Sequence, residues 1–265
     1  MTRALAFALL LLLIGCNSPT VPTGPSSASA PAALPPNEST PSNPTATADT
    51  WIISGQSNAV GCAGGIGPSK SGRVLMPLVG SWVPASDPLS FVEPCSGCEV
   101  GAWVTAAQVY NAAAGRAIKL TGWARVSSAI SLWRADQDGW SRLRARIRSD
   151  GQAATTFLWW QGEAEAASNQ ATGYAAALAD LVRRVRDEAH NPSMRVVVIA
   201  LADAPYPDLR KGYERLRNEQ RTFVANDGRA LIVSAEGLPL NPDKPYHLTV
   251  SGYAELGRRV AAAMR

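Results

Sequence analysis

The chain has 265 residues, and its 25 lysines and arginines exceed its 21 aspartates and glutamates to give a formal net charge of +4 at pH 7. This excess is spread along segments of helical period, as in the run from Arg142 to Arg148, and is not concentrated in a tail. Such a pattern is typical of the solvated face of a helix, so the charge gives little support to nucleic-acid binding.

The first predicted element is an export signal over residues 1–16. One positive charge at Arg3 precedes an apolar run from Ala4 to Ile14, which has the length of a secretory h-region and is short for a membrane span. The run ends in Leu-Ile-Gly-Cys, which resembles the bacterial lipobox, with Cys16 as the lipidated residue. The alternatives are a plain secretory signal and an uncleaved anchor. We expect an exported lipoprotein of the bacterial cell envelope, held at a membrane through Cys16.

Residues 17–49 are predicted to be a disordered tether. The segment is dense in Pro, Ser, Thr and Ala and has almost no large apolar side chains. Such a composition cannot bury enough apolar surface to offset the entropy lost on ordering. Behind a lipid anchor, this tether would hold a folded domain away from the membrane surface.

Residues 50–265 are predicted to form one α/β domain, because their length suits a single domain with a sizeable core. Apolar strand-like runs alternate with segments of helical period, and the runs lack the strict alternation of half-buried strands. A doubly wound sheet with helices on both faces is therefore expected. The predicted strands are residues 50–53, 117–123, 155–160, 195–202 and 230–234, and the predicted helices include residues 174–185, 209–224 and 253–260.

Polar residues follow two of these predicted strands. Ser57 comes after the first strand, and Gln161 and Glu163 come after the strand at residues 155–160. In a doubly wound sheet, ligands bind outside the carboxyl ends of the strands, so these side chains are expected at one edge. The Gly-, Pro- and Ser-rich segment at residues 62–99 has no clear period and starts beside Ser57, so we expect it to form a wall of the pocket.

Three cysteines lie in the predicted domain, at Cys62, Cys95 and Cys98. In an exported protein two of them could pair and leave one over. The spacing of Cys95 and Cys98 also occurs in metal knuckles, but no second CxxC and no nearby histidine completes one. We predict one disulfide that involves Cys62 or Cys98, with the pairing left open.

The sequence SGQSNAVG, from Ser54 to Gly61, admits two interpretations. Gly, Ser and Asn are ordinary turn residues. A serine on a sharp turn between a strand and a helix could instead lift its hydroxyl clear of the sheet edge, beside N–H groups that can hold an oxyanion. Such a serine needs a neighbouring base, and the pKa of histidine suits that task.

The chain has two histidines, which are too few for a three-histidine catalytic zinc site. His190 ends a predicted helix, where an imidazole commonly meets the last carbonyls. His247 lies in the loop between the last predicted strand and the final helix. His247 is therefore the candidate base, with Asp243 as the nearest carboxylate that could orient it. The alternative is a surface-loop histidine beside a helix cap.

Three segments, SGQSNAVG, LWWQGEAEA and PDKPYHLTVSGY, together resemble the motifs of the SGNH hydrolases. The similarity is to the branch of sialate O-acetylesterases and acetyl xylan esterases that is also known as carbohydrate esterase family six. It covers most of residues 50–265 in order and spacing. The resemblance implies a flavodoxin-like three-layer α/β/α sandwich with a five-stranded parallel sheet. It also implies removal of acetyl groups from sugars without a metal or another cofactor.

The resemblance implies a role for each matching residue. Ser57 would be the nucleophile and His247 the base, which later acts as the acid that protonates the departing sugar hydroxyl. The oxyanion hole would consist of the N–H groups of Ser57 and Gly101 and the side-chain amide of Gln161. Gly64 and Gly65 are the alternatives to Gly101, because they also lie near the predicted pocket segment.

One position departs from the family pattern. The family usually has its aspartate three residues before the histidine, where this chain has Lys244, and Asp243 lies one residue further back. Pro245 restricts Lys244 to extended backbone angles, so a longer loop could still direct Asp243 at His247. Glu163 could orient the ring instead or contact substrate, or a serine–histidine dyad could suffice.

We therefore expect a monomeric serine esterase that removes O-acetyl groups from a glycan through an acetyl-serine intermediate. The alternatives are a catalytically weak carbohydrate-binding or cell-wall-associated module on the same fold, and a broader acyl esterase or lipase. The identity of the acetylated glycan stays open, because substrate choice depends on loop shapes. Trp82 is the candidate for a ring that stacks on sugar, against the alternative of packing in the core or a loop.

Overall fold

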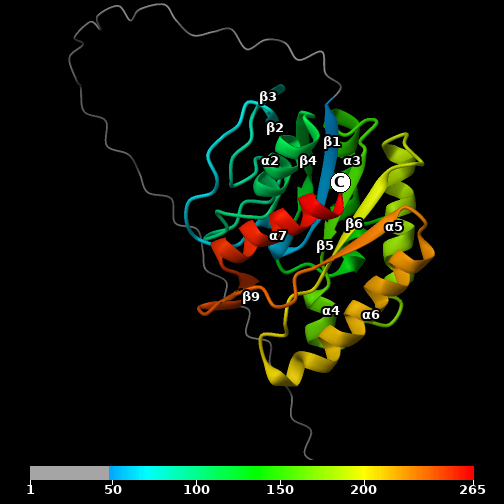
Figure 1. Ribbon diagram of the computed structural model, residues 1–265. Coiled ribbons are helices and arrows are strands. Elements are labelled where there is room, and N and C mark those ends of the chain that lie inside the picture. The colour runs from blue at the N-terminus through cyan, green and yellow to red at the C-terminus, as the bar shows by residue number, and fades with distance from the viewer. Residues whose placement is uncertain (1–47) are drawn as a thin grey trace, which may run out of the picture. The chain divides into compact units, whose positions relative to one another are not determined.

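The computed structural model describes residues 48–265 and is built around a seven-stranded sheet (Figure 1). The strand order is β3-β2-β4-β1-β5-β6-β7, and all neighbours are parallel except β2 and β3. The strands are β1 (Asp49–Gly55), β2 (Val74–Leu78), β3 (Ser81–Pro84), β4 (Ile118–Ala124), β5 (Thr156–Trp160), β6 (Arg195–Ala200) and β7 (Ala230–Ser234).

The five predicted strands are β1, β4, β5, β6 and β7, and they lie side by side in the order of a flavodoxin-like sheet. The sheet nevertheless has seven strands where five were expected, because β2 and β3 form within the segment predicted to be irregular. β2 pairs with β4 only at Val74 and Leu75, so Pro77 lies beyond that ladder and its missing N–H costs no hydrogen bond there. This short contact explains why β2 has no strong sequence signal.

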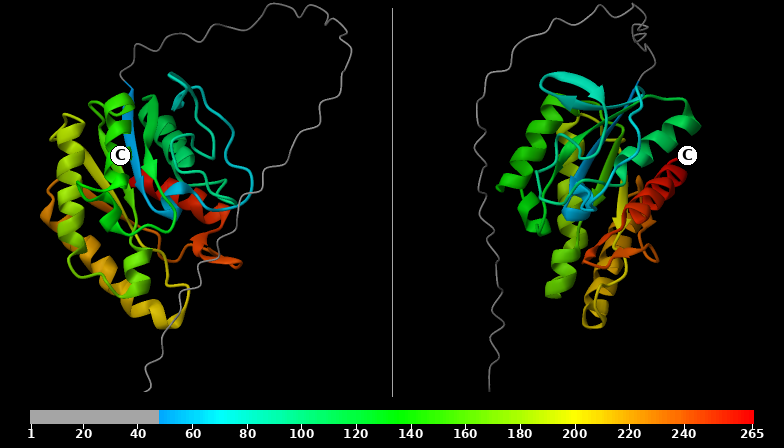
Figure 2. Two further views of the ribbon diagram at one scale, coloured as in Figure 1. Left: turned by 180° about the vertical axis from the view of Figure 1, so that it is seen from behind. Right: turned by 90° about the vertical axis from the view of Figure 1, so that its left-hand side faces the viewer.

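Helices cover both faces of the sheet and complete the three-layer sandwich (Figure 2). On one face α2 (Trp103–Ala114) packs against α7 (Val250–Ala263), whereas α3 (Asp138–Asp150), α5 (Tyr174–Glu188) and α6 (Arg210–Asn226) pack in series on the other. The shorter elements are α1 (Ser57–Val60), η1 (Ile130–Trp133), α4 (Glu163–Ser168), η2 (Pro207–Leu209) and the hairpin of β8 (Leu240–Asn241) and β9 (Lys244–Leu248). None of the helices in residues 48–265 combines the length and apolar character needed to cross a membrane.

Aromatic side chains from the strands fix the helices on the sheet. Trp160, in β5, is fully buried and contacts Trp103 of α2 and Tyr253 of α7 edge to face, with ring centroids 6.2 and 5.8 Å apart. Burying a ring of this size contributes on the order of 2–3 kcal/mol. β5, the strand that leads to Gln161, is thus held in place by α2 and α7.

The start of the domain differs slightly from the prediction. The export signal of residues 1–16, including Cys16, lies outside the described residues, and so does the tether of residues 17–49 except for its last two positions. Asp49, which was assigned to the tether, begins β1. Its N–H donates to the Ala117 carbonyl at 2.9 Å, and its carboxylate accepts from Arg116 at 2.8 Å. The folded domain therefore includes residue 49.

Candidate active site

Ser57 sits on a tight turn at the carboxyl end of β1. Gly55 has a φ of 139°, and a Cβ placed there would lie 1.9 Å from the Trp160 carbonyl oxygen, so only glycine fits. This close approach lets the Gln56 N–H donate to the Trp160 carbonyl at 3.0 Å. Ser57 then begins α1, which ends after four residues at Gly61 in the left-handed conformation. The strand–turn–helix geometry expected around Ser57 is therefore present.

The Ser57 side chain faces a small pocket at the carboxyl edge of the sheet. The pocket has a volume of about 300 Å³ and contains His247 as well as Ser57. Its lining residues are Gln56, Ser57, Ser127, Glu163, Ala164, Ala167, Tyr246 and His247. Ser57 is 8% exposed, so little of this residue is open to solvent. Two residues from opposite ends of the domain, the candidate nucleophile and the candidate base, thus share one cavity.

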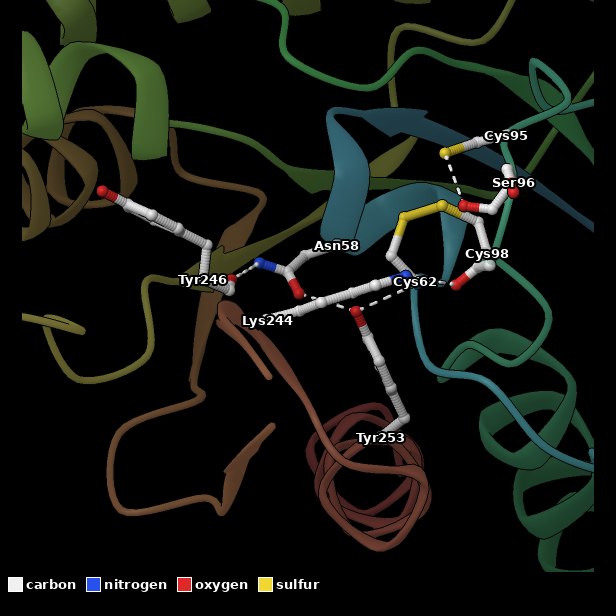
Figure 3. Close-up of a disulfide and its surroundings, with 9 residues drawn as sticks. Asn58, Cys62, Cys95, Ser96, Cys98, Lys244, Tyr246 and Tyr253 are labelled. Atoms are coloured by element: carbon white, nitrogen blue, oxygen red, sulfur yellow. Dashed lines mark hydrogen bonds between the residues drawn. A yellow bond between two sulfur atoms is a disulfide. The ribbon is translucent and has the colours of Figure 1, made fainter. Parts of the chain in front are cut away.

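Asn58 holds the walls of this pocket together. Its Nδ2 donates to Glu163 Oε1 at 2.6 Å and to the Tyr246 carbonyl at 2.9 Å. The Tyr253 hydroxyl donates to Asn58 Oδ1 at 2.7 Å and accepts from the Cys62 N–H at 3.2 Å. Figure 3 shows the Asn58 side chain between the Tyr246 backbone and the Tyr253 hydroxyl. The residue after Ser57 therefore fixes the position of the loop that carries His247.

His247 lies in β9, the second strand of the small hairpin, and is half-buried. Its pKa is lowered from 6.5, first by burial and second by the nearby positive charge of Lys244. The imidazole is therefore neutral near pH 7, which is the form that accepts a proton. The Nδ1 atom is buried and has no hydrogen-bond partner among residues 48–265.

Asp243 does not orient His247 in this structure. The Asp243 residue is exposed, and its N–H donates to Asn241 Oδ1 at 3.0 Å within the hairpin turn. The loop has one extra residue between Asp243 and the histidine, compared with the family pattern. It does not bring the Asp243 carboxylate to His247, because His247 Nδ1 has no hydrogen-bond partner among the described residues. The catalytic aspartate inferred from the family pattern has no geometric support here.

Glu163, the alternative carboxylate, lines the pocket beside Ser57 and His247. Burial raises its pKa from 4.5 to about 7, although the hydrogen bond from Asn58 lowers it. Its Oε1 accepts from Asn58, whereas its Oε2 is buried without a partner among the described residues. No hydrogen bond joins Glu163 to His247, so the structure places this carboxyl group in the pocket without assigning it to the imidazole.

Glu163→Gln is expected to flatten the pH dependence of folding stability. Because the folded-state pKa is raised, the folded protein keeps a proton that the unfolded chain releases between about pH 4.5 and pH 7. This stabilising contribution is complete below pH 4.5 and is lost as pH rises through about 7. For a shift of this size it amounts to about 3 kcal/mol.

Urea unfolding of both proteins at pH 5 and pH 8 measures this difference. Glutamine keeps the shape but cannot ionise, so the variant should lose less stability than the wild type across the interval. Glu214→Gln, at an exposed position, is the control and should behave as the wild type does. Identical pH slopes for the wild type and Glu163→Gln would contradict the shifted pKa.

Gln161, predicted to supply an oxyanion donor, is completely buried and is not among the residues that line the pocket. Its Nε2 lies 3.0 Å from Gln56 Oε1, 3.1 Å from the Ser128 carbonyl and 2.6 Å from Glu165 Oε2. These contacts link the ends of β1 and β5. The amide is occupied inside the protein, and its oxyanion role stays a prediction without support from this geometry.

Gly101, the other predicted donor, is buried just before α2 and does not line the pocket. It packs directly on the turn that ends α1, because a Cβ on Gly61 would lie 2.7 Å from the Gly101 Cα. Gly64 and Gly65, the alternatives, are exposed and do not line it either. Of the residues predicted to supply oxyanion donors, only Ser57 lines the pocket.

Within residues 48–265, the three cysteines form one disulfide, between Cys62 and Cys98, and leave the Cys95 thiol free. This result lies within the prediction and resolves the pairing. The bond joins the residue after Gly61 to the far end of the Gly- and Pro-rich segment, as Figure 3 shows. The segment at residues 62–99 is thereby attached beside α1. It was expected to form a wall of the pocket, but none of its residues lines the Ser57 pocket.

Some positions around the pocket were not predicted from the sequence. Gln56 and Asn58 flank Ser57 within the same motif. Their signal in the sequence was an amide side chain, which can both donate and accept hydrogen bonds, on each side of the candidate nucleophile. Tyr246 had no signal beyond its position next to His247. Trp82, the predicted sugar platform, lies in β3 with Lys119 above its ring and lines a different hollow of about 620 Å³. It is therefore not part of the Ser57 pocket.

The class of the protein is a doubly wound α/β fold, a mostly parallel sheet between two helix layers, with a turn serine and a histidine in one pocket at its carboxyl edge. A family model described as carbohydrate esterase, sialic acid-specific acetylesterase, matches residues 47–265. The chain belongs to this family of carbohydrate esterases. A search of curated proteins found no match.

Solved structures support the same fold. The chain is similar to a protein from Arabidopsis thaliana, with 24% identity and a TM-score of 0.71 over 81% of this chain and 96% of that one. It is also similar to a carbohydrate acetylesterase from Xanthomonas citri, with 20% identity and a TM-score of 0.60 over 82% of this chain and 56% of that longer one. NanS has 12% identity and a TM-score of 0.62, with 82% and 96% covered. At these identities the likeness concerns the fold.

Proposed function

We propose that this domain is a serine esterase that removes O-acetyl groups from carbohydrates through an acetyl-Ser57 intermediate. The observation that carries the proposal is the shared pocket of about 300 Å³, which Ser57 and His247 both line. A serine hydroxyl needs a base in reach, and a neutral imidazole at the same cavity can serve as that base. Membership of the carbohydrate esterase family supports a sugar as the alcohol part of the ester.

In the first step, Ser57 Oγ attacks the acetyl carbonyl carbon while His247 takes the hydroxyl proton. The developing oxyanion is held by the Ser57 N–H, which belongs to the first turn of α1 and has no carbonyl partner within that helix. The tetrahedral intermediate then breaks its bond to the sugar oxygen. His247 returns the proton to that oxygen, so the products are the free sugar hydroxyl and acetyl-Ser57.

In the second step, water attacks the acetyl-Ser57 carbonyl while His247 takes a proton from it. The new tetrahedral intermediate breaks its bond to Ser57 Oγ, which regains its proton from His247. Acetic acid leaves, and the enzyme is restored. The net reaction consumes one water for each ester bond and needs no redox partner.

The size of the pocket favours a short acyl group. About 300 Å³ is at the lower end of the range for ligand sites, and the methyl groups of Ala164 and Ala167 provide apolar contact for an acetyl methyl. A long acyl chain would need a larger apolar cavity. The alternative of a lipase is therefore less compatible with this pocket than acetyl ester hydrolysis.

Acetate release from a panel of acetylated glycans tests the proposal. The full-length protein is incubated with acetylated xylan, O-acetylated sialic acid and acetylated peptidoglycan, and with p-nitrophenyl acetate, butyrate and octanoate. We expect acetate from at least one glycan and the fastest chromogenic turnover with the acetate. Failure to release acetate from any substrate would overturn the proposal, and preference for octanoate would identify a lipase.

A catalytically weak carbohydrate-binding module is the second candidate. The observation that favours it is the unpartnered His247 Nδ1, because the tautomer that accepts the Ser57 proton is not fixed by a carboxylate. A fluorophosphonate probe discriminates between the two candidates. Labelling at Ser57, located by peptide mass spectrometry, supports the esterase, and an unlabelled serine supports the weak module.

A further inference from the structure

Two tyrosine rings pack against each other, and one of them lines the pocket. Tyr246 lines the cavity next to His247, and Tyr206 comes from the loop between β6 and η2. Their ring centroids lie 5.9 Å apart with an interplanar angle of 74°, an edge-to-face arrangement. The pair therefore joins a ring from β9 to a ring from the segment that leads into η2.

Both rings are open to solvent. Tyr206 is 46% exposed and Tyr246 is 38% exposed. Within residues 48–265, they are the only aromatic residues among the exposed large hydrophobic ones. Scattered exposed apolar residues are common, but two aromatic rings packed against each other beside a cavity mark a contact surface. Tyr246 lines the pocket and Tyr206 packs on it, which separates the pair from the other exposed apolar residues, Ile66, Leu78 and Val79.

Hydrogen bonds hold the backbone at both tyrosines. The Tyr246 carbonyl accepts from Asn58 Nδ2 at 2.9 Å, which ties the Tyr246 backbone to the residue beside Ser57. The Tyr206 carbonyl accepts from the Leu209 N–H at 3.1 Å, and Pro207 begins the short η2 helix directly after it. A surface anchored in this way binds a ligand at a low cost in conformational entropy.

The geometry also defines which part of a substrate would meet the pair. The acetyl group must enter the cavity to reach Ser57, which is 8% exposed, so the attached sugar ring extends toward the opening. Tyr246 both lines the cavity and is exposed, and Tyr206, which does not line it, packs edge to face on Tyr246. A sugar ring offers an apolar C–H face that matches an aromatic ring and hydroxyls that stay in water.

We propose that Tyr206 and Tyr246 form a platform that binds the sugar ring carrying the acetyl ester. This inference rests on the proposed esterase function and adds the residues that select a cyclic sugar over a small acyclic alcohol. An aromatic contact of this kind contributes on the order of 1 kcal/mol beyond burial, which corresponds to about a three- to tenfold change in affinity.

A binding measurement tests the platform without requiring turnover. Calorimetry compares Ser57→Ala with the double variant Ser57→Ala/Tyr206→Ala, using acetylated xylo-oligosaccharides and 9-O-acetylated N-acetylneuraminic acid as probes. The double variant should bind the accepted probe about three- to tenfold more weakly. Ser57→Ala/Tyr206→Phe, which keeps the ring, should stay within about twofold of the parent.

The matched control is Ser57→Ala/Leu78→Ala. Leu78 is 48% exposed, nearly the same as Tyr206, but lines the separate hollow near Trp82. Its replacement should leave affinity unchanged. Equal affinities for the Tyr206→Ala variant and its parent, or no binding of either probe to the parent, would overturn the platform.

Kinetics separate the platform from the esterase function on which it rests. In the protein that keeps Ser57, kcat/KM is measured for the acetylated sugar and for triacetin. Tyr206→Ala should lower the ratio of the first value to the second about three- to tenfold, mainly through KM. Triacetin serves as the acetyl ester without a ring. An unchanged ratio would refute the platform alone. Absent turnover by the wild type would refute the esterase, while a Tyr206-dependent affinity would still support the platform.

Discussion

Replacing Ser57 with alanine is expected to lower turnover of an acetylated glycan by at least about a thousandfold while the fold is retained. The alanine removes the only oxygen of this residue that could form the acyl intermediate. The residue is 8% exposed, and no side-chain hydrogen bond within the described part of the chain caps the start of α1. Acetate release measures the activity, and thermal unfolding checks that stability is unchanged.

Ser127 provides a matched control for this experiment. It lines the same pocket and has a hydroxyl, but it follows β4 in an exposed turn with a φ of 52°. Ser127→Ala should reduce turnover by less than about tenfold, since a pocket contact contributes far less than a nucleophile. Near-normal activity of Ser57→Ala, or an equal loss in Ser127→Ala, would show that Ser57 is not the nucleophile.

Replacing His247 with alanine is expected to lower turnover by a comparable factor, about a thousandfold or more. The imidazole accepts protons only when it is neutral, so activity should fall as pH falls through the His247 pKa. Burial and Lys244 lower that pKa from 6.5, and the acid limb of the kcat/KM profile should therefore have its midpoint below 6.5. Measuring kcat/KM from pH 4.5 to 8 tests this sign.

Asp243→Ala is the companion variant. Its side chain is exposed and does not meet His247 Nδ1, so we expect a loss of less than about threefold. A loss as severe as that of His247→Ala would contradict this geometry and restore a triad. A midpoint above 6.5 in the wild-type profile would likewise contradict an imidazole whose charged form is destabilised.

The strands could be predicted from the sequence because burial on both faces leaves a local mark. In β6, RVVVIA is apolar and buried at every position after Arg195, and the boundaries of the predicted strands agree with the structure within two residues. β2 and β3 were missed because their pattern is weak: VLMPL contains a proline and makes little contact with β4. Such an element is defined by its partners rather than by its own period.

The site could be predicted in part for a similar reason. The turn at Ser57 and the loop at His247 have local signals in glycines, short polar residues and position after strands, and the structure brings both to one pocket. The environment of Gln161 could not be predicted, because its contacts with Gln56, Ser128 and Glu165 join separate segments. A motif indicates which groups are available, but only packing decides where an amide points.

The hydrogen bond between Tyr253 and Asn58 spans 195 positions of sequence. During synthesis, Ser57 emerges from the ribosome long before the segment that carries His247 and the tyrosine of the last helix. The chain therefore holds its candidate nucleophile for most of translation without the base that would activate it. Esterase activity would then arise only after α7 docks, and an incomplete chain would not hydrolyse esters.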